Sequence, residues 1–208
     1  IPNSRLKTLN EHKYDLGGIE VLKLSSLYGA NGAGKSNLVE SLFLFQKMIL
    51  TEEIPFKLKD SQFKFTDRKE QTFGVEFVQD GTPLYYAVVL SENIILTEEL
   101  YLSALGHKED QLVFERKTLD NEIQLTFLPE FERDEKSKVL KEVLLDFIKP
   151  SEPVLKLLSN RDNRFLKDVK KAYGWWSEKL EIRKHDSEGR ALGNKIDAGA
   201  GVRKYGED

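Results

Sequence analysis

The chain has 208 residues, of which 39% are hydrophobic and 32% charged, with a net charge of −3 and a pI of about 5.8. This length allows one domain with a substantial core, or a large part of a bigger protein, and the charge balance gives no bulk argument for nucleic-acid binding. The sequence has no cysteine, which excludes disulfides and thiolate metal sites, and it has no apolar run near the length of a membrane span and no signal-peptide pattern. We therefore expect a cytoplasmic protein without a membrane partner.

The three histidines are isolated in the sequence, so they predict surface or loop positions and neither a zinc site nor a catalytic histidine. They are His12, His107 and His185.

The first quarter of the chain predicts a strand, a glycine-rich loop and a helix. Residues Val21–Tyr28 read as a strand that runs into the loop. After the loop, Leu38, Leu42, Phe45 and Ile49 fall at helical spacing on one face. The loop between them matches the G-x-x-x-x-G-K-[ST] pattern at every position. A strand before the loop and a helix after it distinguish a true P-loop from a chance match.

The motif predicts a phosphate-binding site for ATP and Mg²⁺. Its glycines allow a tight turn, so that backbone N–H groups point into one nest, and the nest and the following helix N-terminus both favour anionic phosphates. The ammonium of Lys35 is expected at the β- and γ-phosphates, and the hydroxyl of Ser36 is expected to ligate Mg²⁺. The predicted phosphate-binding residues are Gly29, Ala30, Asn31, Gly32, Ala33, Gly34, Lys35, Ser36 and Asn37.

The middle of the chain predicts an antiparallel sheet. Residues Thr51–Lys69 read as a loop with short extended pieces, because Pro55 argues against a helix through it. The Asp80-Gly81 pair that follows the first strand is the strongest short hairpin signal. Five short strands separated by turns are expected over residues 72–78, 84–90, 94–102, 111–116 and 122–127.

The last third predicts three helices. Apolar residues from Val139 to Phe147 form one amphipathic face that ends before Pro150, and a second helix starts at Ser151 and Pro153. The third helix is marked by Phe165, Val169, Ala172 and Trp176. Residues Gly189–Asp208 form a glycine-containing tail with little apolar periodicity.

Two features of the third helix leave alternatives open. The Trp175-Trp176 pair reads either as core packing or as a platform for stacked bases. The lysines of this region read either as a solvated helix face or as contacts to a DNA backbone. They are Lys167, Lys170, Lys171 and Lys179.

The segment Leu27–Leu42 resembles the P-loop of ABC-type ATPases related to RecF, the SMC proteins and the OLD nucleases. It is most similar to bacterial AAA family ATPases of the kind found near abortive-infection, retron and Septu-type antiphage genes. The residues typical of that group are Asn31 before the second glycine and the run Ser36-Asn37-Leu38. The hairpin residues 77–81 and 85–87, the strand 112–116 and the helix 173–176 carry a softer resemblance.

This resemblance implies an α/β fold: an ABC-type P-loop lobe with a mixed core sheet, an antiparallel β-hairpin subdomain and a helical segment. Residues 1–130 would form the nucleotide-binding lobe with the β subdomain, and residues 131–208 the helical segment and tail of the same, incomplete ATPase domain. It also implies ATP hydrolysis in the complete protein, self-association, and a nuclease or toxin effector partner. DNA or RNA is a further possible partner.

Several elements of that family are not evident in the sequence. The hairpin expected before the first strand is not seen, and neither are the signature loop and the switch histidine. The nearest Walker B pattern, Leu144-Leu145-Asp146, lies within a helical pattern, and Gln62 and Gln71 are the only candidates for a Q-loop glutamine. We therefore expect the chain to be part of a larger protein, and we assign no catalytic residue.

Three functions stay open at this stage. The first is an ATPase that controls an effector in antiphage defence. The second is a DNA-repair or chromosome-maintenance ATPase of the RecF or SMC type. The third is a regulatory scaffold that binds ATP with little turnover.

Overall fold

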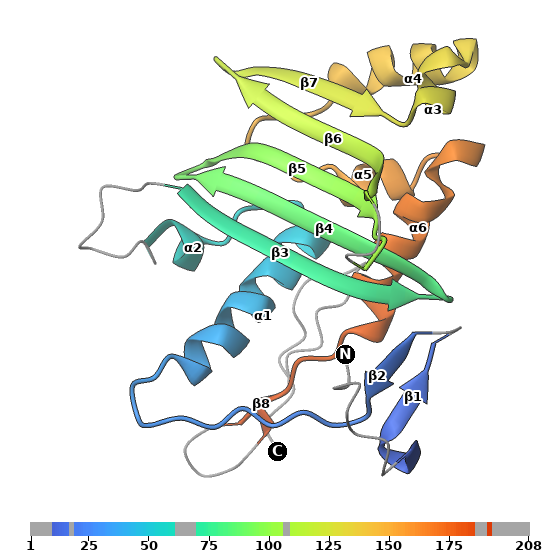
Figure 1. The fold of residues 1–208 in the computed structure, drawn as a ribbon. Helices are drawn as coiled ribbons and strands as arrows, with labels where there is room; N and C mark the ends of the chain where they lie inside the picture. The colour runs from blue at the N-terminus through green and yellow to red at the C-terminus, as the bar shows by residue number, and fades with distance from the viewer. Residues whose placement is uncertain (1–9, 17–18, 61–69, 106–108, 186–190, 193–208) are drawn as a thin grey trace, which may run out of the picture.

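The computed structural model describes residues 10–16, 19–60, 70–105, 109–185 and 191–192. Its centre is a five-stranded antiparallel sheet in which neighbours along the chain are neighbours in space (Figure 1). This meander confirms the five predicted strands. The strands are β3 (Glu70–Gln79), β4 (Thr82–Ser91), β5 (Ile94–Leu102), β6 (Gln111–Leu119) and β7 (Glu122–Phe127).

The Asp80-Gly81 turn joins β3 to β4, as the sequence predicts. Both residues have positive φ, 49° for Asp80 and 71° for Gly81. That is the conformation of the tight hairpin turn whose twist matches the flanking strands. The turn therefore sets the register that pairs Val75 with Tyr86 across the two strands.

One face of the sheet carries the core. Leu84, Tyr86, Val88 and Leu90 alternate along β4 and have no solvent exposure, which is the period-two pattern of a sheet buried on one side. Helix α1 (Lys35–Thr51) packs on this face through Phe45, whose ring stacks on that of Tyr86 at 5.7 Å. The helices from the last third of the chain share the same face (Figure 1).

Those later helices confirm the helical prediction for this region. They are α3 (Pro129–Arg133), α4 (Glu135–Leu145), α5 (Leu155–Ser159), the 3-10 turn η2 (Arg164–Leu166), α6 (Lys167–Gly174) and the π-helix η3 (Trp175–Lys179). Trp176 is fully buried, and its ring meets that of Phe45 edge to face with 5.0 Å between the centroids, whereas Trp175 stacks on Phe77 at 4.4 Å. The tryptophan pair therefore belongs to the core, as the first of its two interpretations states.

Two expectations about the chain before β3 are wrong. The strand predicted for Val21–Tyr28 is only β2 (Glu20–Leu22), because it pairs antiparallel with β1 (Lys13–Asp15) and its continuation has no strand beside it. The resulting β1–β2 hairpin therefore includes the predicted first strand, and the family's hairpin before that strand stays untested. Pro55 precedes a short helix, α2 (Phe56–Asp60), in place of an extended loop, since proline is tolerated at a helix start.

The expected mixed core sheet is not seen among the described residues. Every strand pair in the described part of the chain is antiparallel, including the small pair β8 (Lys184–His185) and β9 (Ala191–Leu192). Helices on an antiparallel sheet remain compatible with the α/β class. The rest of the predicted tail, residues 189–190 and 193–208, lies outside the described residues. The division at residue 130 stays a prediction.

Candidate functional site

The P-loop lies between β2 and α1 at the exposed end of that helix. The C-terminal half of α1 is buried on the sheet, including Phe45, Met48 and Ile49, whereas Leu38 near its start is 60% exposed. Figure 1 shows the helix running out from behind the sheet to the loop. The core therefore holds α1 firmly at one end and presents the loop to solvent at the other.

Two glycines of the loop adopt a left-handed backbone. Gly32 has φ of +83° and Gly34 has φ of +85°, a region that side-chain-bearing residues rarely occupy. No other atom lies within 4 Å of the position that a Cβ would take at either residue. Glycine is therefore required here by the backbone turn and not by crowding, which agrees with the role that the motif predicts.

The side chain of Lys35 folds back over its own loop. Its Nζ donates to the carbonyl oxygen of Gly29 at 2.6 Å and to that of Ala30 at 2.7 Å. The loop is closed further by a 3.1 Å bond from the Ala33 N–H to the Ala30 carbonyl. These bonds hold the Lys35 ammonium against the loop. A phosphate oxygen could replace the Gly29 or Ala30 carbonyl oxygen as the acceptor of its hydrogen bond.

The first turn of α1 supplies further donors. The Leu38 N–H bonds to the Gly34 carbonyl at 3.0 Å, so the N–H groups of Lys35, Ser36 and Asn37 are the ones that helix geometry leaves without an intrahelical acceptor. The first turn has no acidic residue to compete for them. Together with the partial positive charge of the helix N-terminus, they form a site suited to an anion.

The donor set also fits Mg²⁺ bound together with phosphates. Ser36 is exposed at the start of α1 and offers a hydroxyl oxygen, a hard ligand of the kind that this ion prefers. No cluster of three or more His, Asp or Glu side chains that could hold a metal occurs in the described ranges. Among the described residues, Ser36 is the one that would hold such an ion, together with phosphate and water oxygens.

A Walker B carboxylate is not found in the described part of the chain. Asp146 follows the last residue of α4 and is exposed, so Leu144-Leu145-Asp146 ends a helix and not a strand. The sequence has one Asp-Glu pair, Asp134-Glu135. It begins α4, where the Asp134 carboxylate caps the helix by accepting from the Ser137 N–H at 3.0 Å.

One candidate for the Q-loop glutamine, Gln71, is bonded away from the P-loop. The Gln71 amide donates to the Leu58 carbonyl at 2.7 Å and so ties α2 to β3. Gln62 lies outside the described residues.

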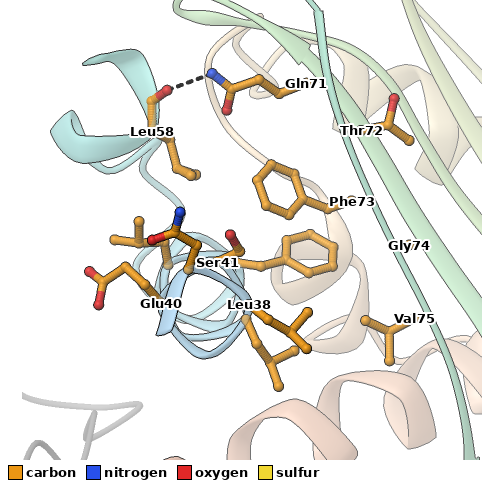
Figure 2. Close-up of a pocket in the computed structure, with 13 residues that line it drawn as sticks. Leu38, Glu40, Ser41, Leu58, Gln71, Thr72, Phe73, Gly74 and Val75 are labelled. Carbon is orange, nitrogen blue, oxygen red and sulfur yellow. Dashed lines mark hydrogen bonds between the residues drawn. The ribbon is translucent and has the colours of Figure 1, made fainter. Parts of the chain in front are cut away.

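A cavity of about 700 Å³ lies along α1, between this helix and β3. Figure 2 shows Phe73 and Val75 of β3 on one side, and Leu38 and Ser41 of α1 on the other. Sequence reasoning did not find this cavity, since it depends on the packing of a helix against a distant strand. Its mainly apolar lining is unsuited to phosphate groups, so the anion site stays with the loop.

The lysines of the third helix do not form a uniform basic face. The Nζ of Lys171 donates to Thr82 Oγ1 at 2.7 Å and lies 3.3 Å from an Asp168 carboxylate oxygen. Lys167, Lys170 and Lys179 are exposed. One of the four lysines proposed to contact DNA is therefore bonded within the protein instead.

Comparison with known proteins assigns the chain to a family. Residues 24–203, which include the whole P-loop, match the sequence profile of the family described as "AAA domain, putative AbiEii toxin, Type IV TA system". This match spans most of the chain, which therefore belongs to that AAA-domain family of P-loop ATPases. No curated protein and no solved structure matches the chain significantly.

Proposed function

We propose that this AAA-domain chain binds Mg·ATP at residues 29–37. The observation that carries the proposal is the geometry of the loop: the left-handed Gly32 and Gly34, the Lys35 ammonium bonded across the loop, and the open N-terminus of α1. In this arrangement Lys35 and the backbone N–H groups bind the phosphates. Ser36 holds Mg²⁺, which when bound neutralises phosphate charge.

For the complete protein we propose ATP hydrolysis that controls an effector, a nuclease or a toxin, in antiphage defence. The family description, which names a toxin of a toxin–antitoxin system, supports this setting. A scaffold that binds ATP with little turnover is the second candidate, because the described residues contain the phosphate site without a recognisable Walker B carboxylate. No described helix is both long enough and apolar enough to cross a membrane.

Isothermal titration of Mg·ATP into the wild-type chain and Lys35→Ala tests the proposed binding. The variant loses a charge-assisted contact to phosphate, so its affinity should fall about tenfold to a hundredfold. Lys47→Ala is the matched control, because it removes the same charge from the same helix about 18 Å further along its axis. Equal affinities of Lys35→Ala and wild type would reject the proposed site.

We propose in addition that the protein self-associates with ATP at the subunit boundary. Large apolar side chains are exposed on both flanks of the loop, including Leu24 (80%), Leu27 (61%) and Tyr28 (88%) before it and Leu38 (60%) after it. Clustered exposure of this kind marks interaction surfaces. Light scattering with and without a non-hydrolysable ATP analogue tests it, and a monomer under both conditions would contradict it.

A further inference from the structure

One buried polar side chain joins the P-loop helix to the end of the helical segment. Gln46 is only 6% exposed and lies among the buried apolar residues of α1. Its Nε2 donates two hydrogen bonds of 2.8 Å, one to the Trp176 carbonyl and one to the Leu180 carbonyl. The amide thus connects positions 130 and 134 residues away in the sequence.

The acceptors belong to an unusual turn. Residues Trp175–Lys179 form a π-helix, closed by a 3.0 Å bond from the Leu180 N–H to the Trp175 carbonyl. Such wide turns are rare and occur frequently at functional sites. The carbonyls at the end of a helix lack intrahelical donors, and Gln46 supplies donors to two of them from another helix. The π-turn is therefore held in place by α1.

Helix α1 is anchored at its C-terminal end and exposed at its N-terminal end, next to the P-loop. The Lys156 ammonium donates to the Leu50 carbonyl at 2.9 Å, which ties the C-terminus of α1 to α5. Near the loop, Leu38 and Val39 are exposed. A displacement of α1 that began at the loop would reach Gln46 before it reached the anchored C-terminus.

Hydrogen bonds and apolar contacts respond differently to such a displacement. The ring contact between Phe45 and Trp176, at 5.0 Å, tolerates small sliding. The two bonds of the Gln46 amide are directional and weaken steeply when their geometry changes. A small rotation or translation of α1 must therefore either move the backbone at Trp176 and Leu180 or break both bonds.

From this geometry we propose that Gln46 transmits the nucleotide state of residues 29–37 to the π-turn and the segment that follows it, residues 175–183. The proposal rests on the proposed binding of Mg·ATP. Gln46 acts as a positioning residue, since it lies about 16 Å along α1 from Lys35. The element that responds is the π-turn, because two of the carbonyls at its end are bonded to α1 through Gln46.

Hydrogen–deuterium exchange of the chain, with and without a non-hydrolysable Mg·ATP analogue, tests the proposal. In the wild type, nucleotide should change the exchange rate of amides in residues 175–183 by about fivefold or more. The variants Gln46→Met and Gln46→Asn cannot make both bonds, so this change in exchange rate should be lost in them. Their affinity for the analogue, measured by calorimetry, should stay within about threefold of the wild-type value. Thr51→Val removes a side-chain bond within α1 alone, to the Lys47 carbonyl, and should retain the response.

Two results overturn the proposal: a wild type that binds the analogue with unchanged exchange in residues 175–183, or a Gln46 variant with the full response. The wild-type comparison decides even if both variants fail to fold. Calorimetry separates these results from failure of the proposed function. If the wild type shows no binding at all, the nucleotide site itself is wrong and the proposal falls with it.

Discussion

The phenol of Tyr86 donates a 2.9 Å hydrogen bond to the carboxylate of Glu98, and neither residue is exposed to solvent. The same carboxylate accepts from the N–H groups of Val154 and Leu155 at 2.7 and 2.9 Å. Burial raises the pKa of Glu98, whereas the charge of Arg116 and these hydrogen bonds oppose that rise. The network fastens the start of α5 to the sheet, and so positions the helices that pack beside α1.

Glu98→Ala should lower the free energy of unfolding by about 3–5 kcal/mol, because it leaves the Tyr86 hydroxyl and the N–H groups of Val154 and Leu155 without their buried acceptor. It also removes the negative charge near the buried Arg116 guanidinium. Tyr86→Phe removes one hydrogen bond and should cost about 1 kcal/mol. Urea denaturation measures both. Glu142→Ala, at an exposed position, is the control and should stay within about 0.5 kcal/mol of the wild type. A Glu98→Ala variant as stable as this control would contradict the assigned role.

Asp134 should make stability depend on pH. Hydrogen bonds from the Ser137 hydroxyl and N–H, followed by the Arg164 charge, lower the pKa of its carboxyl. Because the folded-state pKa lies below the unfolded value of about 3.9, the stability that the charge contributes is present above that value. It is lost as pH falls through the folded pKa.

Urea denaturation of wild type and Asp134→Asn over a pH series measures this effect. Asparagine still caps a helix but has no charge. The stability difference between the two proteins should be constant above about pH 5 and should narrow below about pH 4. A difference that does not change down to about pH 3 would show that the Asp134 charge contributes nothing.

Substitution of the tryptophans should separate core packing from base stacking. Trp176→Ala should cost about 3–5 kcal/mol, because it empties a fully buried site between α1 and the sheet. Trp175→Ala should also destabilise the fold, since this ring stacks on Phe77. Fluorescence anisotropy with a labelled single-stranded oligonucleotide should show no loss of binding in Trp175→Ala relative to wild type. A loss of binding at unchanged stability would favour the stacking interpretation.

The chain should bind ATP but release phosphate at the background rate. It has the groups that bind phosphates. Binding of the ground state without selective stabilisation of the transition state does not accelerate hydrolysis. A phosphate-release assay measures this, with Lys35→Ala as the control for contaminating ATPases. Turnover that depends on Lys35 would mean that a catalytic carboxylate is present after all, and Asp146, Glu152 and Asp197 would be the first residues to substitute.

The sequence alone determined those features that depend on neighbours along the chain. The P-loop could be read because Gly32, Gly34 and Lys35 act through local backbone conformation and two short side-chain bonds. The β3–β4 hairpin could be read because Asp80-Gly81 encodes its own turn. The amphipathic helices could be predicted from the spacing of their apolar residues. This spacing indicates which face of a helix is buried but not which element packs against it.

Only the tertiary structure decided what depends on residues far apart in sequence. It placed β2 against β1 and ended the strand at Leu22, because a strand lasts only as long as it has a partner. It brought Glu98 beside Val154, and Gln46 beside Trp176 and Leu180. A buried Glu or Gln has no signature in a sequence, since its cost is offset by donors and acceptors that folding alone brings within reach.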